Sequence, residues 1–581
     1  MDRFIRDKFR RIYSVHILNN EKINFDMNFL TPKKISGVSF IYALLMLGVV
    51  ILISILSIVP PVSRDALIHH LAIPKLYLRH GGMFEIPAFS YSYYPMNLDL
   101  LYLVSLYFKN DILPKFIHFA FALATVSMIY QYLKRQINTQ YALLGSLFFL
   151  SIPIIVCQSS TVYVDLGLVC FLFAAITYLF QWIKDDFKFK YFIVSAVFCG
   201  LALGTKYNGL IGLLLLGLFV PFVYARYHSG DSSHTGKALG YSAGYIFIAL
   251  IVFSPWMIRN VIWTGNPVYP LYQSVFNSGI AASMENIDEN ASGKRSPMNH
   301  FQIRRDLYGE SGLEIAIIPL RVFFQGQDND PKYFDGRANP FLFLLPIFAF
   351  FGLRANGRQI RTEKFLMLGF SVFFLLFACV QTSIRIRYFA PIFPPLVVLA
   401  MFGLHNIQAY FLRQDHRISI VVKQITIFGI IFVMLGLNAK YIVERFRYVQ
   451  PMGYLTGKMT RDEYIQKYRP EYFSMQFANR YLSKNDRILG IYIGNRSYYS
   501  DIDILFSVDL LQKLAAKAKF SVDIAEGLRD RKISHLLVNY ELFNFWVNKY
   551  SLHEKKMLKV FFELYTVRKF SKDGNGLLKV L

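Results

Sequence analysis

Carboxylate, imidazole and cationic side chains gather in one short stretch of this chain, from Arg64 to Pro95. Asp65 and His69 are four positions apart, so they share one face if the stretch is helical, and His70 lies beside them. A carboxylate among imidazoles is chemically suited to proton transfer or to metal coordination. The stretch is therefore either a reaction centre or a polar loop capped by a helix at a membrane interface.

Four further charged residues stand where apolar segments meet polar ones: Asp165, Lys206, Arg259 and Arg387. Each has a simpler explanation. Asp165 suits the N-cap of the apolar segment that follows it, and Lys206 and Arg387 suit snorkelling towards the lipid head groups. A Pro-Trp interfacial anchor explains the neighbours of Arg259 but not the arginine. With Asp65 they place two carboxylates and three cations at one predicted membrane face, which no single one of these explanations covers.

The composition is that of a polytopic membrane protein. Of the 581 residues 54% are hydrophobic and 17% aromatic, which is too apolar for a soluble chain of this length. The net charge of +25 lies beside apolar segments and in the C-terminal region, so it indicates control of topology and not binding of nucleic acid. The cysteines follow no pairing or metal-ligand spacing: Cys157, Cys170, Cys199 and Cys379.

About eleven apolar segments are predicted to cross the membrane, with the N-terminus inside and the C-terminus outside. They are residues 37–58, 113–133, 141–157, 166–183, 190–205, 209–226, 237–257, 339–353, 363–381, 388–404 and 421–442. The apolar segment 96–108 is too short to cross, and we expect a helix at the interface there. Lysine and arginine gather in the predicted inside connections, whereas the outside connection 158–165 has neither, in agreement with the positive-inside rule.

This topology divides the chain into three parts. Residues 1–36 are predicted to be a basic cytoplasmic segment, and residues 37–442 an all-α transmembrane domain with outer loops at 60–112 and 259–338. Residues 443–581 alternate β-rich runs with helical patterns. That order predicts a small extracytoplasmic α/β domain with a partly parallel sheet.

The first outer loop is predicted to begin with a short interfacial helix from Asp65 to Tyr77, because apolar residues recur there at helical spacing. Pro74 is expected to bend or end that helix, and Gly81-Gly82 to turn the chain. The charged residues of this loop are therefore expected at the outer membrane face.

Several motifs resemble one superfamily, in the same order along the chain. DALIHHLAIPKLYLRHGG and the YYP that follows it resemble the first outer loop of the GT-C glycosyltransferases, in the glycosyltransferase family 39-like subgroup related to protein O-mannosyltransferases and aminoarabinose lipid A transferases. TVYVDLGL, GLALGTKYNGL, SPWMIRNVIWTGNPVYPL and RYFAPIFPPL are similar to later segments of that subgroup. One departure matters: Ala66 follows Asp65 where the mannosyltransferase branch has a second acidic residue, so no role of that residue carries over.

The resemblance implies a GT-C fold and a glycosyltransferase of the bacterial inner membrane, with its site facing the periplasm or exterior. The donor would be a sugar linked to a polyprenyl phosphate, and the acceptor a hydroxyl group of an envelope glycan, a lipid or a protein. Membrane lipids would be further partners, and no nucleic acid is expected. The related lipid-monophosphate enzymes are not thought to need a metal, so no metal and no other cofactor is predicted.

The resemblance also implies roles for the charged residues. Asp65 would be the general base that takes the proton of the acceptor hydroxyl. His69 and His70 would orient that carboxylate or hold the acceptor, and Asp165 would bind sugar hydroxyls or support Asp65.

The leaving group would be a lipid phosphate, whose growing negative charge needs fixed cations. Lys206 and Arg387 are the first candidates for that role, and Arg259 is the third.

Two alternatives from other classes remain. A transporter or flippase of a lipid-linked or anionic substrate would use the same cations, but internal repeats typical of many transporters are not visible in the sequence. A non-catalytic scaffold would bind partners through its basic C-terminal domain.

Overall fold

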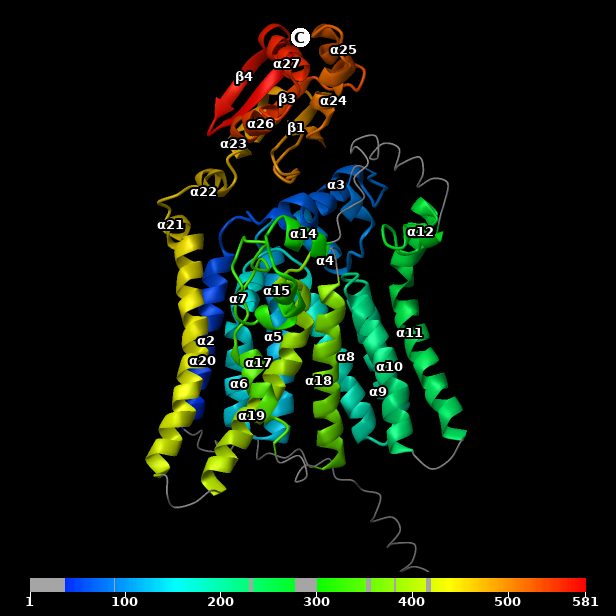
Figure 1. The fold of residues 1–581 in the computed structure, drawn as a ribbon, viewed down its shortest axis with the longest axis vertical. Coiled ribbons are helices and arrows are strands. Elements are labelled where there is room, and N and C mark those ends of the chain that lie inside the picture. The colour runs from blue at the N-terminus through cyan, green and yellow to red at the C-terminus, as the bar shows by residue number, and fades with distance from the viewer. Residues whose placement is uncertain are drawn as a thin grey trace, which may run out of the picture.

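The computed structural model describes residues 37–87, 89–228, 233–276, 300–351, 357–380, 383–413 and 419–581. Its larger part is a bundle of roughly parallel helices, and a small domain of strands and helices lies at one end of that bundle (Figure 1). The predicted fold class, an all-α polytopic membrane protein with a small C-terminal α/β domain, is confirmed.

Eight helices in the described ranges are long and apolar enough to cross a membrane. They are α2 (Gly37–Ser57), α5 (Leu113–Gln136), α8 (Asp165–Lys184), α10 (Gly209–Tyr227), α11 (Ser233–Thr264), α18 (Arg358–Cys379), α19 (Phe393–Arg413) and α20 (Ile420–Val449). Helices α6 (Thr139–Ser151) and α7 (Pro153–Ser159) make a ninth span if they cross together, although the chain bends by 67° between them.

The predicted count of eleven spans stays a prediction, because two of the predicted segments form short helices. Helix α9 (Phe189–Leu203) has 15 residues and α17 (Phe341–Phe348) has 8, whereas a straight crossing needs about twenty residues. Helical structure is nevertheless present in each of the predicted segments.

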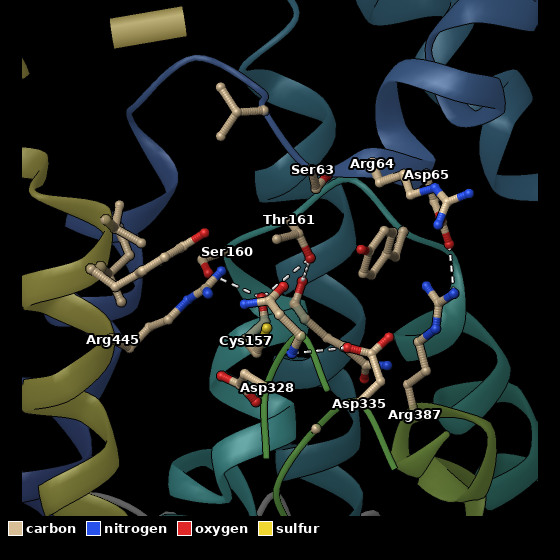
Figure 2. A pocket seen from close by; sticks show the side chains of 18 of the residues that line it. Ser63, Arg64, Asp65, Cys157, Ser160, Thr161, Asp328, Asp335, Arg387 and Arg445 are labelled. Carbon is tan, nitrogen blue, oxygen red and sulfur yellow. Dashed lines mark hydrogen bonds and ion pairs between the residues drawn. The ribbon is translucent and has the colours of Figure 1, made fainter. Parts of the chain in front are cut away.

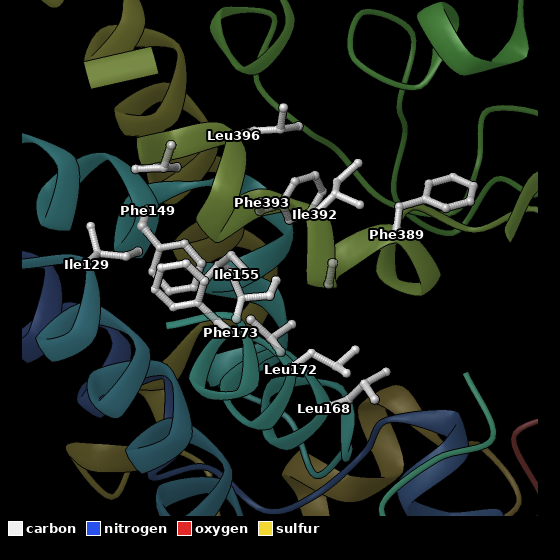
Figure 3. Packing of buried hydrophobic residues seen from close by; sticks show 14 of the residues in the cluster. Ile129, Phe149, Ile155, Leu168, Leu172, Phe173, Phe389, Ile392, Phe393 and Leu396 are labelled. Atoms are coloured by element: carbon white, nitrogen blue, oxygen red, sulfur yellow. The ribbon is translucent and has the colours of Figure 1, made fainter. Parts of the chain in front are cut away.

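Helix α8 is deeply enclosed within the bundle. In its most apolar window 78% of the residues are buried, compared with 22% in α2, whose apolar side chains face outward as lipid-facing residues do. Leu172 and Phe173 of α8 approach Ile392 and Phe393, which lead into α19 (Figure 3). The first residue of α8, Asp165, is therefore held by a well-packed element.

The chain between α2 and α5 forms a cap on the end of the bundle that also carries the small domain (Figure 1). It contains a turn of π-helix, η2 (Ala66–His70), then α3 (Ala72–His80), a 3₁₀ turn η3 (Ser90–Tyr93) and α4 (Asn97–Tyr107). The expected helix is present and Gly81 ends it with φ +81°, as predicted, but the break lies at Leu71 and not at Pro74. Pro74 sits in the first turn of α3, where its missing N–H costs little.

The connection from α11 to α17 contains short helices α12 (Gln273–Phe276), α14 (His300–Asp306), α15 (Gly312–Ala316) and α16 (Ile318–Arg321). Arg259 was expected to open this loop, but α11 continues to Thr264 and contains it. Apolar residues such as Val261 and Ile262 continue the helical pattern past the predicted end. Before α19 the chain forms a 3₁₀ segment, η6 (Ile386–Ile392), within the first part of the predicted span 388–404.

After α20 the chain passes through α21 (Pro451–Leu455), α22 (Arg461–Tyr468) and α23 (Tyr472–Tyr481) into the small domain. Its strands are β1 (Arg487–Ile491), β2 (Asp503–Phe506), β3 (His535–Asn539), β4 (Thr566–Lys572) and β5 (Asn575–Val580). Its helices are α24 (Leu510–Lys517), α25 (Val522–Arg529), α26 (Tyr540–Val547) and α27 (Leu552–Leu564). The sheet order is β2-β1-β3-β5-β4, with β2, β1 and β3 parallel and the other pairs antiparallel, so the predicted partly parallel sheet is confirmed.

Candidate active site

Two ion pairs lie at the end of the bundle beneath the small domain. Arg387 Nη2 is 2.6 Å from Asp65 Oδ2, and Lys206 Nζ is 2.6 Å from Asp165 Oδ1. The ring of Tyr388 lies between the two cations, with its centre 4.5 Å from Lys206 Nζ and 5.2 Å from Arg387 Cζ. Four of the predicted residues, from four separate segments, are thus brought into one cluster.

Asp65 stands at the start of η2 and makes no capping hydrogen bond there, so its carboxylate is directed to Arg387 instead (Figure 2). The two side chains are 17% and 9% exposed. Burial alone would raise the pKa of Asp65, but the Arg387 guanidinium outweighs burial and holds this pKa well below its usual range. Asp65 is therefore ionised throughout the neutral pH range.

Asp165 is the first residue of α8, but its side chain does not cap that helix. The backbone N–H of Leu166 donates instead to Nε2 of His118, at 2.9 Å, so an imidazole from α5 satisfies this helix end. Asp165 is 2% exposed and reaches Lys206, which is 18% exposed. The N-cap explanation for Asp165 is therefore wrong, and Lys206 has Asp165 as its partner.

The two histidines of η2 have different surroundings. Nδ1 of His70 is 2.8 Å from Oδ1 of Asp99 on α4, an aspartate that is itself buried, so His70 ties η2 to α4. The ring of His69 stacks on Tyr91 with centres 4.5 Å apart, and its Nδ1 has no hydrogen-bond partner among the described residues. Burial and then His70, Arg387 and Lys206 lower the pKa of His69 well below its ordinary value, so it is neutral.

Arg259 occupies a different position from the other two cations. Its Nη2 donates to the carbonyls of Tyr93 and Tyr94, at 2.6 and 3.0 Å, and the guanidinium lies between the rings of Trp256 and Trp263. These contacts fasten the turn η3 to α11. The structure therefore gives Arg259 a bracing position and gives Lys206 and Arg387 the positions beside the carboxylates.

The small domain reaches down to the same cap. Lys75 of α3 donates to the carbonyls of Tyr498 and Ser500, at 2.6 and 3.0 Å, and to Oδ1 of Asp501, at 2.9 Å. The hydroxyl of Tyr499 donates to the carbonyl of Pro61, at 2.8 Å. The segment that carries Asp65 is thus held from both sides.

Sequence reasoning missed four residues of this arrangement: Asp99, His118, Tyr163 and Tyr388. Tyr163 lies under the Arg387 guanidinium, whose Cζ is 4.8 Å from the ring centre. Tyr163 is two positions before Asp165, and Tyr388 directly follows Arg387. An aromatic residue beside a charged one at a predicted membrane face was the signal available in the sequence. His118 and Asp99 had no local signal, because their partners are distant in sequence.

Asp65, His69 and Asp165 are chemically suitable ligands for a metal ion. In the part of the chain that the structure describes, no group of three or more His, Cys, Asp or Glu side chains is arranged to hold a metal ion. Both carboxylates are engaged by cations instead.

One family model matches part of the chain. Residues 103–259 match the family model described as dolichyl-phosphate-mannose-protein mannosyltransferase. No curated protein matches the whole sequence significantly.

Solved structures share the fold at low sequence identity. ArnT from Cupriavidus metallidurans in the apo state has a TM-score of 0.53 and 12% identity over 93% of this chain and 98% of its own. The same protein bound to undecaprenyl phosphate has a TM-score of 0.52 and 12% identity, over 93% of this chain and 97% of its own. The oligosaccharyltransferase of Archaeoglobus fulgidus, tethered with an acceptor peptide, has a TM-score of 0.53 and 9% identity, over 92% of this chain and 74% of its own.

The chain thus has the fold of ArnT, and residues 103–259 are similar to dolichyl-phosphate-mannose-protein mannosyltransferases, in line with the resemblance to GT-C glycosyltransferases.

Proposed function

We propose that this protein transfers a sugar from a polyprenyl-phosphate donor to a hydroxyl acceptor, with Asp65 as the general base. The observation that carries the proposal is the pairing of Asp65 with Arg387, next to the second pair of Asp165 with Lys206. One carboxylate and two cations within one cluster match the needs of a reaction that removes a proton and releases a phosphate.

The reaction is a single displacement at the anomeric carbon of the donor. The acceptor oxygen forms a bond to that carbon while the bond from the carbon to the phosphate oxygen breaks. The electron pair of the broken bond stays on the lipid phosphate, and the acceptor proton passes to the Asp65 carboxylate. Lys206 and Arg387 stabilise the charge on the departing phosphate.

Arg387 couples donor binding to the strength of the base. In the resting protein its guanidinium holds Asp65 as a weak base. A bound phosphate competes with Asp65 for the donors of Arg387, whose Nε is buried without a hydrogen-bond partner among the described residues. Loosening the pair raises the basicity of Asp65 when the donor is present and the proton must be taken.

Lipid-phosphate donors are supported by the chemistry of the relatives. The ArnT structure contains undecaprenyl phosphate, and an archaeal oligosaccharyltransferase, AglB, of TM-score 0.50 is in complex with dolichol-phosphate. The proposal extends that donor class to this chain and leaves the sugar open.

The test is the replacement of Asp65 by Asn, which keeps the size of the side chain but removes its basicity. A positioned general base contributes roughly 10²–10⁴-fold, so transfer from a polyprenyl-phosphate sugar should fall by about that factor while undecaprenyl phosphate binding survives. Asp306→Asn, an exposed carboxylate on α14 at the same end of the protein, is the matched control and should keep its activity. Near-normal transfer by purified Asp65→Asn protein would reject this role, and unchanged lipid movement without transfer would favour a flippase.

We further propose that the site and the small domain face the periplasm or exterior of a bacterial inner membrane. A cysteine at Ser571, exposed on β4, should react with an impermeant thiol reagent added from outside, and one at Ser419, before α20 at the opposite end of the bundle, should not. Unsubstituted protein supplies the background from its own four cysteines. Labelling of the Ser419 site alone from outside would invert the proposed orientation.

A further inference from the structure

A cavity of about 300 Å³ opens beside Asp65 and extends away from Lys206, which is not part of its lining. Figure 2 shows Asp65 and Arg387 on one side of this cavity and Arg445, from α20, on the other. Asp328 and Asp335, from the connection between α11 and α17, lie between them. The cavity thus begins at Asp65, the proposed base. Its other walls include α20 and the connection between α11 and α17, which carry neither Lys206 nor Arg387.

The lining carries more positive than negative side chains. Its cations are Arg64, Lys115, Arg385, Arg387, Arg445 and Arg469, against three carboxylates. Asp65 and Asp335 already pair with Arg387 and Arg385, the latter pair at 3.0 Å. The other lining cations, Arg64, Lys115, Arg445 and Arg469, outnumber the one other carboxylate, Asp328, and this excess of positive charge favours an anionic ligand.

Polar atoms of this cavity also lack partners. Both amide atoms of Gln158 are buried without a hydrogen bond to the described residues, and so are Oδ1 of Asp328 and the Nε atoms of Arg445 and Arg469. A buried polar group without a partner is costly, so such a set indicates a ligand that supplies the missing donors and acceptors. An amide, a carboxylate and two guanidinium groups together suit hydroxyl groups and an anionic substituent.

The remaining lining suits a sugar better than a polyprenyl chain. Tyr163, Tyr448, Tyr464 and Tyr468 present rings and hydroxyl groups, and aliphatic side chains are a minority of the lining. A polyprenyl tail would need a continuous apolar path, which these side chains do not offer. The ligand is therefore polar, anionic and able to place a hydroxyl group near Asp65.

We propose that this cavity is the acceptor site and that the acceptor is an anionic saccharide, with its phosphate or carboxylate on Arg445 and Arg469 and one hydroxyl facing Asp65. This inference rests on the proposed function and names the substrate class of the same site. The acceptor hydroxyl gives its proton to Asp65 as described above, and the anionic group of the acceptor takes no part in the bond changes. Arg387 borders both the cavity and the donor cluster, so it stands where the two substrates meet.

The test measures binding of two probes by the full-length protein in nanodiscs. One probe is a phosphorylated disaccharide and the other is undecaprenyl phosphate. Arg445→Gln and Arg469→Gln should each weaken binding of the disaccharide roughly tenfold or more, because each loses a charge-assisted contact, and should leave the undecaprenyl phosphate Kd within about twofold. Arg445→Lys should restore part of the affinity, and Arg447→Gln, an exposed neighbour on α20, should change neither Kd.

Comparison of probes identifies the kind of saccharide. The unphosphorylated disaccharide should bind much more weakly than the phosphorylated form. An octyl glycoside of the phosphorylated disaccharide that binds more tightly than the free form indicates a glycolipid acceptor, and equal binding indicates a soluble glycan. Either result supports an anionic saccharide.

Four outcomes overturn the inference. Loss of undecaprenyl phosphate binding in the two glutamine variants would make the cavity a donor site. Equal binding of the neutral and phosphorylated disaccharides would remove the role of the cations, and no binding of either would leave a protein acceptor. If Asp65→Asn is inactive while Arg445→Gln and Arg469→Gln bind the phosphorylated disaccharide normally, the inference fails and the proposed function stands.

Discussion

The backbone N–H of Tyr498 donates a hydrogen bond of 3.2 Å to the carbonyl of Leu67, in the π-helical turn that follows Asp65. A loop of the small domain thus contributes directly to the backbone of the proposed active-site turn. Tyr498 also packs against the apolar cluster around Ala66 and Leu71. The small domain therefore positions the base without contacting the reacting atoms.

Lys75→Met should loosen that turn, because Lys75 holds the loop of Tyr498 by three hydrogen bonds. We expect kcat to fall roughly tenfold with little change in the donor KM, given the strength of charge-assisted bonds. Arg79→Met is the matched control: Arg79 contacts Asp501 in a more exposed setting, so its loss should cost little. Equal effects of the two variants, or no rescue by Lys75→Arg, would contradict a positioning role.

Lys206→Ala and Arg387→Ala should raise the amount of donor needed and slow transfer. Each loses a charge-assisted contact to phosphate worth roughly 1.5–3 kcal/mol, which is about ten- to a hundredfold in kcat/KM. Steady-state kinetics with a polyprenyl-phosphate sugar measure the effect, and Lys184→Ala, at the other end of α8, is the control. Normal kinetics in both variants would remove these cations from the donor site.

Asp165→Asn should destabilise the protein strongly, although Asn is a good N-cap. The reason is that Asp165 neutralises Lys206 in a buried setting, and breaking a buried pair costs roughly 3–5 kcal/mol. The double variant Asp165→Asn with Lys206→Met should regain much of that loss, because no uncompensated charge remains. The double-mutant cycle compares the natural protein, Asp165→Asn, Lys206→Met and the double variant by thermal unfolding in one detergent. Strictly additive changes in Tm would show that Asp165 and Lys206 are not coupled.

The pH dependence of transfer should depend on Arg387. Because the pKa of Asp65 is depressed, its carboxylate form is present above that low pKa and is lost only as the pH falls through it. kcat/KM of the natural protein should therefore stay nearly level from about pH 8 down to about pH 5. In Arg387→Gln the pKa of Asp65 rises, since burial now acts without the guanidinium, so the acidic fall in kcat/KM should move to higher pH. An acidic limb at the same pH in both proteins would mean that another group controls it.

The sequence predicted the parts of this protein that depend on local pattern. Apolar runs located the helices, apolar β-rich runs located β1 and β3, and Gly81 marked the end of α3. Asp65, Lys206 and Arg387 could be singled out because a charge at a membrane face is costly and so requires a reason.

The pairing of these residues could not be predicted, because it is a property of packing. Asp165 looked like a helix cap, and only the fold shows that His118 fills the cap and frees the aspartate for Lys206. The bracing of Arg259 by tryptophans one turn away on each side depends on the extension of α11 to Thr264. The position of Arg445 opposite Asp65 depends on how α20 closes against the bundle, which no local pattern encodes.

The contact between Lys75 and Tyr498 joins residues 423 positions apart, and this separation has a consequence for biosynthesis. A ribosome completes Lys75 early, and domains fold as they emerge in order from the N-terminus. The turn that carries Asp65 cannot receive its last support until almost the whole chain has been made and the C-terminal residues have crossed to the same side. A nascent or truncated chain would therefore insert its helices without this support for Asp65, so under the proposed function unfinished copies would not consume the lipid-linked sugar.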